Sequence, residues 1–226
     1  MKANKDCALF AGVEEGKLSE LKLALRAVKR SFGKGEVIIN QGDRTDKLGV
    51  VISGAIEATH LSHNGNSTLI ATLGAGEVFA DFLAANGTMK SPVSLISTEG
   101  CTALLIPFEA LLTDTKEFAE ERHVLLSNLA KIYAEKYFAL MDRMICVSAT
   151  TMREKIIRFL SYMYGKTGAS TFEIPFDREG LARYLSVDRS ALSRELSRMK
   201  NEGLIEYYKS SFRIIDKSLL RNGKFF

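Results

Sequence analysis

The amino-acid sequence predicts an α+β protein in three parts: an N-terminal β-roll or jelly roll (1–113), a long helix (114–147) and a C-terminal winged helix-turn-helix (148–226). Three observations predict this organisation. Short β-branched runs alternate with glycine, glycine and proline are absent from 116 to 147, and the last part follows the order helix, turn, helix, hairpin. With 226 residues, the chain is long enough for more than one buried core.

The predicted roll is a series of short strands broken by glycine turns over residues 32–107. The runs are "FGKGEVIINQGD", "KLGVVISGAIEATHLS", "STLIATLGAGEVFAD" and "SLISTEGCTALLIP". Such regular short strands favour an antiparallel roll. The preceding stretch "EGKLSELKLALRAVKR" has leucines at helical spacing, so we expect a helix over 15–30.

The long helix carries an apolar seam whose members recur at alternating steps of four and three residues. This heptad spacing is typical of paired helices, although a stripe of this kind can also pack on the chain's own β domain. We favour pairing with a second copy, because further apolar residues widen the surface beyond one stripe. The seam consists of Leu126, Ala130, Tyr133, Tyr137, Leu140, Met144 and Val147.

Positive charge gathers in the last third of the chain. Residues 148–226 hold 15 Lys and Arg against 9 Asp and Glu, a net charge of +6, whereas residues 1–113 and 114–147 each have a net charge of −1. This asymmetry indicates a polyanionic partner for the C-terminal part alone.

Within that part, two aspartates mark the starts of two short helices. Asp177 precedes "REGLARYL" and Asp188 precedes "RSALSRELSRMKNEG", which Gly203 ends. A hairpin from "LIEYY", the turn "KSS" and "FRIID" follows. The order is that of a winged helix-turn-helix.

The second of these helices groups its basic and hydroxyl side chains on one face. With Arg189 at zero and a step of about 100° per residue, they fall within an arc of about 140°, while the leucines cluster elsewhere. Arginine can fork onto guanine and serine can bond to base edges or phosphates, so we expect this face to bind double-stranded DNA. A merely solvated face is the alternative, and the surrounding helix and hairpin make it the weaker one. The members of this recognition face are Arg189, Ser190, Ser193, Arg194 and Ser197.

Three residues outside this helix are expected to contact the DNA backbone. Arg178 begins the preceding helix, and Lys209 and Ser210 lie at the hairpin tip. Contacts of this kind fix register without reading sequence.

Other function classes find little support. The three cysteines are far apart and indicate neither a disulfide framework nor a metal site, so we expect no metal and no cofactor, and a reducing cytoplasm. The N-terminal stretch "MKANKDCALF" has no continuous apolar run, so we expect no secretion signal, and no apolar run in the sequence is long enough to span a membrane. No nucleophile triad, phosphate loop or HExxH motif stands out, so we expect no enzyme.

The chain resembles the Crp–Fnr family of bacterial transcription regulators (cAMP receptor protein and fumarate-nitrate regulator). "FGKGEVIINQGD", "VVISGAIEA", "LGAGEVFAD" and above all "FDREGLARYLSVDRSALSRELSRMKNEGLI" carry the resemblance. It implies a homodimer paired through the long helix, an effector sensed by the roll, a roughly palindromic operator, and RNA polymerase as a partner. It also implies base reading by Arg189, Ser190, Ser193 and Arg194, and a phosphate contact by Arg178. Many relatives have glutamate where Ser190 stands, so the operator is expected to differ from the best-known consensus.

The resemblance also identifies a departure in the roll. Cyclic-nucleotide binders of the family show Gly-Glu and then Arg-Ser/Thr-Ala, where this chain has Ala80-Asp81 and Lys90-Ser91-Pro92. Lysine lacks the bidentate fork of arginine, and proline removes a backbone N–H. We therefore expect a small molecule or anion other than cAMP. An iron–sulfur cluster is disfavoured because the family's N-terminal cysteine cluster is absent, and haem is disfavoured because His60 and His63 lie in an expected hairpin loop, where histidines are more often surface residues than haem ligands. The candidate effector residues are Asp81, Lys90, Ser91, Tyr133 and Tyr137.

Two alternatives stay open. The chain could be a sensor module whose winged helix binds another protein, which would favour exposed apolar residues on the recognition face. It could also be a constitutive regulator without an effector.

Overall fold

The computed structural model describes residues 7–65, 67–113, 115–174 and 176–218. The predicted limits at residues 1, 114 and 226 lie outside the described residues. The chain divides into two compact units, residues 1–133 and 134–226. The division falls inside one long helix, α4 (Ala119–Val147).

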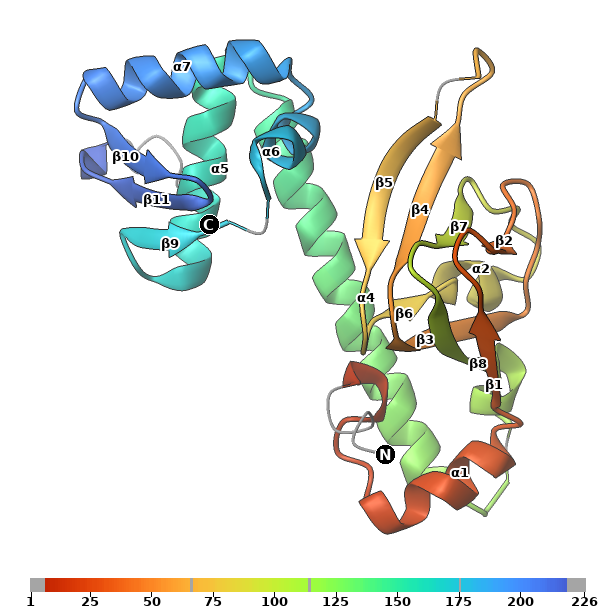
Figure 1. Ribbon diagram of the computed structural model, residues 1–226. Helices are drawn as coiled ribbons and strands as arrows, with labels where there is room; N and C mark the ends of the chain where they lie inside the picture. Colours follow the sequence, from red (N-terminus) through yellow and green to blue (C-terminus); the bar gives the residue numbers. More distant parts are fainter. Residues whose placement is uncertain (1–6, 66, 114, 175, 219–226) are drawn as a thin grey trace. The chain divides into compact units, whose positions relative to one another are not determined.

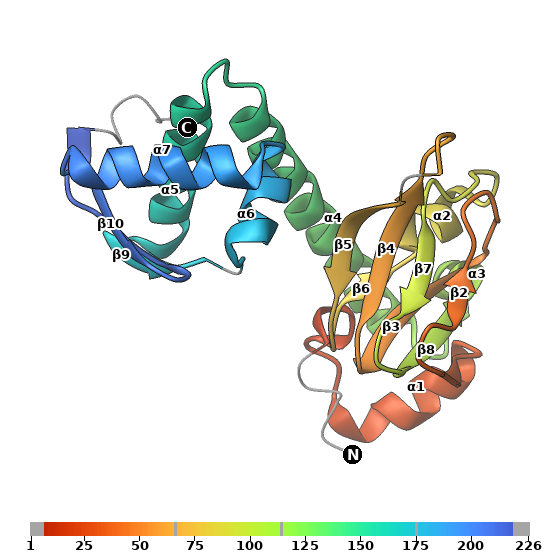
Figure 2. The ribbon, with the colours of Figure 1, turned by 45° about the horizontal axis from the view of Figure 1, so that its top comes forward.

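The first unit is built around two four-stranded antiparallel sheets (Figure 1). One sheet has the strand order β1-β8-β3-β6 and the other has the order β2-β7-β4-β5. Figure 2 shows the four strands of the second sheet side by side. The predicted roll is confirmed. The strands are β1 (Val28–Phe32), β2 (Val37–Ile39), β3 (Lys47–Ser53), β4 (Ile56–Leu61), β5 (Ser67–Leu73), β6 (Val78–Phe79), β7 (Ser94–Ser97) and β8 (Cys101–Pro107).

Alternation along the strands gives this unit two cores. In β3, Val51 joins the core between the sheets, whereas Leu48 and Val50 point to the opposite face and join a core with the helices. Gly49 is required between them, since an added Cβ would lie 2.0 Å from the ring of Phe79. The helices that cover the outer face are η1 (Ala8–Phe10), η2 (Glu15–Lys17), α1 (Leu18–Ala24), α2 (Asp81–Asn86), α3 (Phe108–Leu112) and the first half of α4.

The helix expected over residues 15–30 is shorter than predicted. It ends with α1 at Ala24, Arg26 adopts a left-handed φ of 52°, and Val28 begins a strand. β1 pairs along its whole length with β8, from Val28 with Leu105 to Phe32 with Cys101. This long-range ladder outweighs the local helix preference of "RAVKR".

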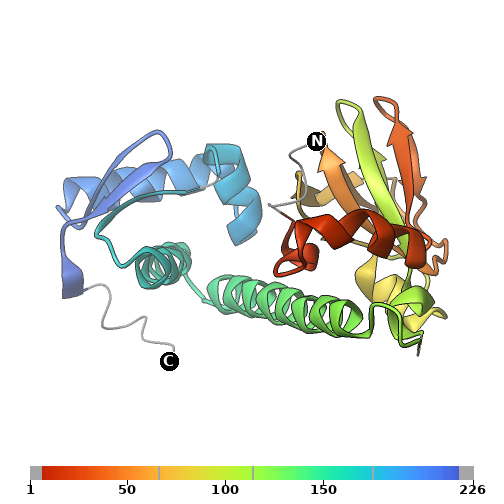
Figure 3. The ribbon, with the colours of Figure 1, turned by 90° about the horizontal axis from the view of Figure 1, so that it is seen from below.

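Helix α4 runs without interruption, as Figure 3 shows in green. In its first half, Leu125, Leu129 and Ile132 are buried in the core of the first unit. Asn128 is also buried, and its amide donates to the carbonyls of Leu9 and Ala11 over 3.0 and 2.7 Å. These bonds fix the N-terminal segment against the helix.

The second unit confirms the predicted winged helix-turn-helix. Its elements are α5 (Met152–Thr167), β9 (Thr171–Glu173), α6 (Arg178–Leu185), α7 (Arg189–Asn201), β10 (Ile205–Tyr208) and β11 (Ser211–Ile214). The three strands form a sheet in the order β10-β11-β9 (Figure 1). The core includes Phe159, Leu192, Leu196 and Phe212, and also Cys146 from the end of α4.

Arginines attach α4 to this winged unit. The Nε of Arg143 donates to the carbonyl of Tyr184 over 3.2 Å, at the C-terminal end of α6. Arg158 of α5 donates to the carbonyl of Ile145 over 2.8 Å. Cations at the carbonyl ends of helices are favourable, so residues 134–147 form part of the winged fold.

Candidate nucleic-acid interface

The helix-turn-helix owes its geometry to the two predicted caps. Asp177 accepts from the backbone N–H of Gly180 over 2.7 Å, and Asp188 accepts from that of Ala191 over 2.8 Å. Each cap satisfies one of the N–H groups that a helix start leaves unpaired. The Ser190 hydroxyl and the Ala191 N–H hold the pKa of Asp188 below its ordinary value.

The recognition face of α7 is exposed except at Ser193, which is half-buried, and Arg194 is the least engaged cation of this face. Arg194 is exposed and makes no hydrogen bond or ion pair with another residue in the described part of the chain. Arg189 is also exposed, with its Nε 3.7 Å from a carboxylate oxygen of Glu179. An ion pair this long and exposed is weak, so both guanidiniums are available to a ligand.

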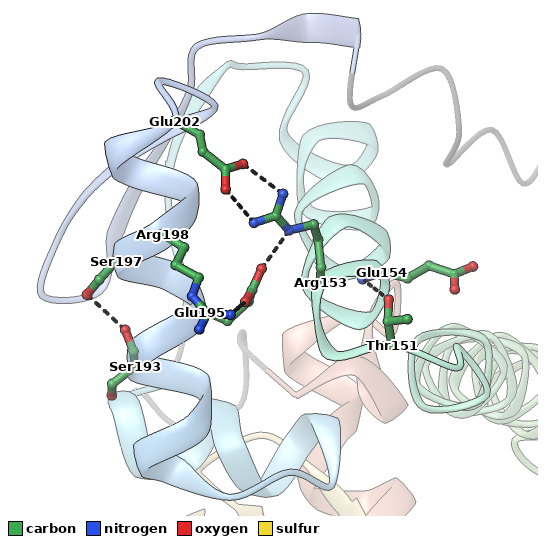
Figure 4. A network of polar contacts seen from close by, with 8 residues as sticks. All are labelled: Thr151, Arg153, Glu154, Ser193, Glu195, Ser197, Arg198 and Glu202. Atoms are coloured by element: carbon green, nitrogen blue, oxygen red, sulfur yellow. Dashed lines mark hydrogen bonds and ion pairs between the residues drawn. The ribbon is translucent and has the colours of Figure 1, made fainter.

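Two of the three serine hydroxyls of this face, those of Ser190 and Ser197, are engaged within the chain. Ser190 donates to the carboxylate of Asp188 over 2.5 Å, and Ser197 donates to the carbonyl of Ser193 over 2.9 Å (Figure 4). Each hydroxyl still has lone pairs that can accept. To donate to a base edge or phosphate, Ser190 and Ser197 must give up these bonds.

The predicted phosphate contacts lie around the wing. The guanidinium of Arg178 is centred 4.9 Å from the ring of Tyr207 and 5.6 Å from that of Phe212. Partial burial lowers the pKa of Arg178 from its ordinary value. Lys209 adopts a left-handed φ of 51° at the hairpin turn, and Ser210 donates to the carbonyl of Phe176 over 3.1 Å, which holds the hairpin.

Two residues of this surface were missed by the sequence analysis. The hydroxyl of Tyr207 lies 3.3 Å from that of Ser197, and the amine of Lys200 lies 5.5 Å from the centre of the Tyr207 ring. Lys200 falls at about 20° on the helix projection, inside the arc already described, so its position was predictable. No local pattern indicated Tyr207, because strand β10 brings it there.

The candidate effector residues are only partly brought together. Asp81 and Ser91 are buried, and the hydroxyl of Tyr133 donates to the backbone carbonyl of Asp81 over 3.3 Å. Burial raises the pKa of Tyr133 to about 12. Ser91 instead donates to the carbonyl of Val93 over 2.6 Å, and Lys90 is exposed. Tyr137 is exposed and belongs to the second unit.

All three cysteine side chains are buried. Cys7, Cys101 and Cys146 are free cysteines. Burial raises the pKa of Cys146 to about 11 and also raises that of Cys7. Neutral thiols are poor nucleophiles and poor metal ligands. Among the described residues no group of three or more His, Cys, Asp or Glu side chains is placed to hold a metal ion, and no helix there could span a membrane.

Comparisons with known proteins agree with this architecture. Residues 29–113 match the family model "Cyclic nucleotide-binding domain", and residues 154–222 match the "Crp-like helix-turn-helix domain". The chain is 24% identical over 201 residues to the transcriptional activator protein FnrL of Cereibacter sphaeroides, which covers 83% of this chain and 77% of that protein. It is 21% identical over 217 residues to the CRP-like cAMP-activated global transcriptional regulator of Mycobacterium tuberculosis, which covers 94% of both.

Solved structures show the same fold. CprK complexed with OCPA matches with a TM-score of 0.72 at 15% identity, over 91% of this chain and 92% of that one. A CooA mutant from Carboxydothermus hydrogenoformans matches with a TM-score of 0.64 at 17% identity, over 95% and 92% of the two chains. The two curated relatives named here are transcriptional regulators and not enzymes. Together, the two family models, these relatives and the exposed basic helix place this chain in the Crp–Fnr family of DNA-binding transcription regulators.

Proposed function

We propose that the protein is a homodimer that reads a roughly palindromic operator, with α7 of each copy in the major groove of double-stranded DNA. The observation that carries the proposal is the exposed basic face of α7. Its two arginines are free to fork onto guanine, and the buried leucines behind them anchor the helix. Arg178, Lys209 and Ser210 flank this face and contact backbone phosphates.

Pairing through the seam of α4 is supported by the exposure of its second half. The side chains of Tyr137, Leu140 and Met144 are 58%, 64% and 56% exposed. Large apolar side chains gathered on one exposed helix face mark an interaction surface. A partner helix related by a two-fold axis would cover them, and two half-sites about 34–36 Å apart would then meet the two recognition helices.

The effector is a small molecule or anion other than cAMP. Ala80 stands in the left-handed region, with a φ of 55°, where the cyclic-nucleotide binders of the family have glycine. Lys90 and Pro92 replace the phosphate clamp of those relatives. The buried polar side chains of Asp81 and Ser91, with Tyr133 beside Asp81, are the groups that such a ligand would meet.

The setting of the proposed function is the cytoplasm, where a regulator of this family meets DNA and RNA polymerase. Effector binding would favour one pairing of the two α4 helices, and with it one spacing of the recognition helices. Transcription would respond through polymerase recruitment or exclusion at the operator.

The test is selection of duplexes from a random library by the purified full-length protein, followed by fluorescence anisotropy over a salt series. Arg194→Ala is expected to reduce the preference for the selected duplex over a scrambled one by roughly 5- to 150-fold per half-site. Arg198→Ala is the matched control, because it removes the same charge from the same helix outside the recognition face. Equal discrimination by both variants would contradict base reading by α7. A library that yields no preferred sequence, with or without cell extract, would contradict operator binding altogether.

A further inference from the structure

An arginine from another helix binds two carboxylates on the rear of the recognition helix. Arg153, in the first turn of α5, donates from Nε to Glu195 over 2.6 Å and from its two terminal nitrogens to Glu202 over 2.7 and 2.8 Å. Figure 4 shows the guanidinium between the two carboxylates. The contact with Glu202 is a parallel, bidentate fork, the geometry that adds directional specificity to an ion pair.

The two glutamates lie opposite the recognition face. Glu195 and Glu202 are seven positions apart in the sequence. On the helix projection with Arg189 at zero they fall at about 240° and 220°, whereas the recognition face is centred at about 70°. A group that fixes their carboxylates therefore fixes how far α7 can turn about its own axis. The apolar contacts of Leu192 and Leu196 bury this helix but are not directional.

Small rotations of α7 matter for base reading. A turn of about 20° moves an atom at about 5.5 Å from the helix axis by about 2 Å. Binding constellations must be held to within about 0.5 Å to work. The bidentate fork therefore adds a directional restraint on this rotation to the non-directional apolar contacts.

The fork to Glu202 is poorly placed to serve stability alone. The side chains of Arg153 and Glu202 are 37% and 45% exposed, and an ion pair with this exposure contributes little to folding. The contact of Arg153 with Glu195, whose side chain is 13% exposed, is the more buried of the two and also helps to hold α7 in the fold. Hydrogen bonds from Arg153 hold the pKa of Glu202 below its ordinary value, so the pair is charged throughout the neutral range.

We propose that Arg153 is a positioning residue, which sets the rotation of α7 through Glu195 and Glu202 and thereby the discrimination between operator and other DNA. The proposal rests on the operator reading proposed above. It does not make Arg153 a DNA contact, since its guanidinium is directed at the rear of the helix.

The test compares full-length variants on the selected and scrambled duplexes. Arg153→Met/Glu202→Gln removes the fork without changing the net charge, and it leaves Glu195 with Arg198, 3.5 Å away. We expect discrimination to fall about 10-fold, within the range for one misplaced base contact, while affinity for the scrambled duplex and the salt slope stay within about twofold. Arg153→Lys keeps the charge but not the fork, and it is expected to lose part of the discrimination.

The controls separate positioning from folding and from the proposed function. Lys166→Met removes an exposed cation from the last turn of α5, at the opposite end of that helix from Arg153, and it is expected to keep discrimination. If the double variant and Arg153→Lys both discriminate like wild type while Arg194→Ala does not, the positioning role is wrong and operator reading stands. If Arg194→Ala also discriminates like wild type, operator reading by α7 is wrong. If the double variant does not fold, Arg153→Lys tests the proposal alone: a partial loss of discrimination supports the positioning role, and discrimination equal to wild type contradicts it.

Discussion

The two compact units differ in the side chains that they bury and expose: the first buries several polar side chains, whereas the second exposes arginines and large apolar side chains. In residues 1–133, the polar side chains of Asp81, Ser91 and Asn128 are buried, and Asn128 and Ser91 bond to carbonyls of the same unit. In residues 134–226, the arginines of α7 and the apolar second half of α4 face outward. From this difference we expect that loss of a buried polar side chain in the first unit reduces stability, whereas loss of an exposed arginine of α7 in the second unit reduces binding.

The largest expected effect tests the outward apolar surface. Leu140→Lys places a charge in the seam, and since burial of one leucine is worth about 1.5–3 kcal/mol, losing it from both copies should weaken dimerisation by 100-fold or more. Sedimentation velocity over a dilution series measures this. Glu135→Lys adds a lysine to the same helix outside the seam and is the control. A Leu140→Lys protein that sediments as wild type would show that the seam is not the dimer interface.

The next effect tests the inward polar groups. Asn128→Ala removes two hydrogen bonds and leaves the carbonyls of Leu9 and Ala11 without them, so the free energy of unfolding should fall by about 2–3 kcal/mol. Urea denaturation followed by circular dichroism measures the change. Asn201→Ala, on the exposed surface of α7, should change stability far less. Equal costs at the two positions would break the contrast between the units.

A smaller effect concerns the cap of the recognition helix. Because the pKa of Asp188 is lowered in the folded protein, its contribution is present above its ordinary value of 3.8 and is lost as the pH falls through the folded pKa. Asp188→Ala should lower the melting temperature by a few degrees at neutral pH. Asp188→Asn keeps an acceptor and should remove this pH dependence. Melting curves from pH 7 to pH 2 check both, and an unchanged acid profile in the asparagine variant would contradict the assignment.

The smallest effect concerns the backbone of the roll. Ala80 adopts a left-handed conformation that costs a residue with a Cβ about 1–2 kcal/mol, against the larger conformational entropy of glycine in the unfolded chain. Ala80→Gly should therefore raise the free energy of unfolding by about 0.5 kcal/mol. Calorimetry measures it, with Ala84→Gly in helix α2 expected to destabilise. A loss of stability in Ala80→Gly would mean that the alanine methyl contributes more by packing than its conformation costs.

Local signals were sufficient for most of the winged unit. Aspartates at the two helix starts, glycine after the second and one arc of basic side chains each act over a few residues, and the structure confirms the caps at Asp177 and Asp188. The roll was predictable as a class from its glycine-separated runs. Its boundaries were less so, because pairing of Val28–Phe32 with a distant strand ended the predicted helix early.

Long-range side-chain partners were beyond sequence reasoning. Arg153 and Glu202 are 49 residues apart, and nothing near either residue indicates the other. The same holds for Tyr207 beside Ser197, which depends on how the hairpin folds back on α7. For Ser190 and Ser197, the position on the recognition face was predictable from the sequence. The hydrogen bonds of their hydroxyls to Asp188 and to the Ser193 carbonyl were not.

The burial of Cys146 in the winged core, with Arg143 fixed to the end of α6, has a consequence for exchanging parts between regulators. A chimera joined after Val147, at the apparent end of the helix, would separate the DNA-binding half from two of its own anchors. A splice near residue 133, kept in heptad register, would transfer them intact. Recombination between family members should leave hybrid genes whose crossover lies inside the helix rather than at its end.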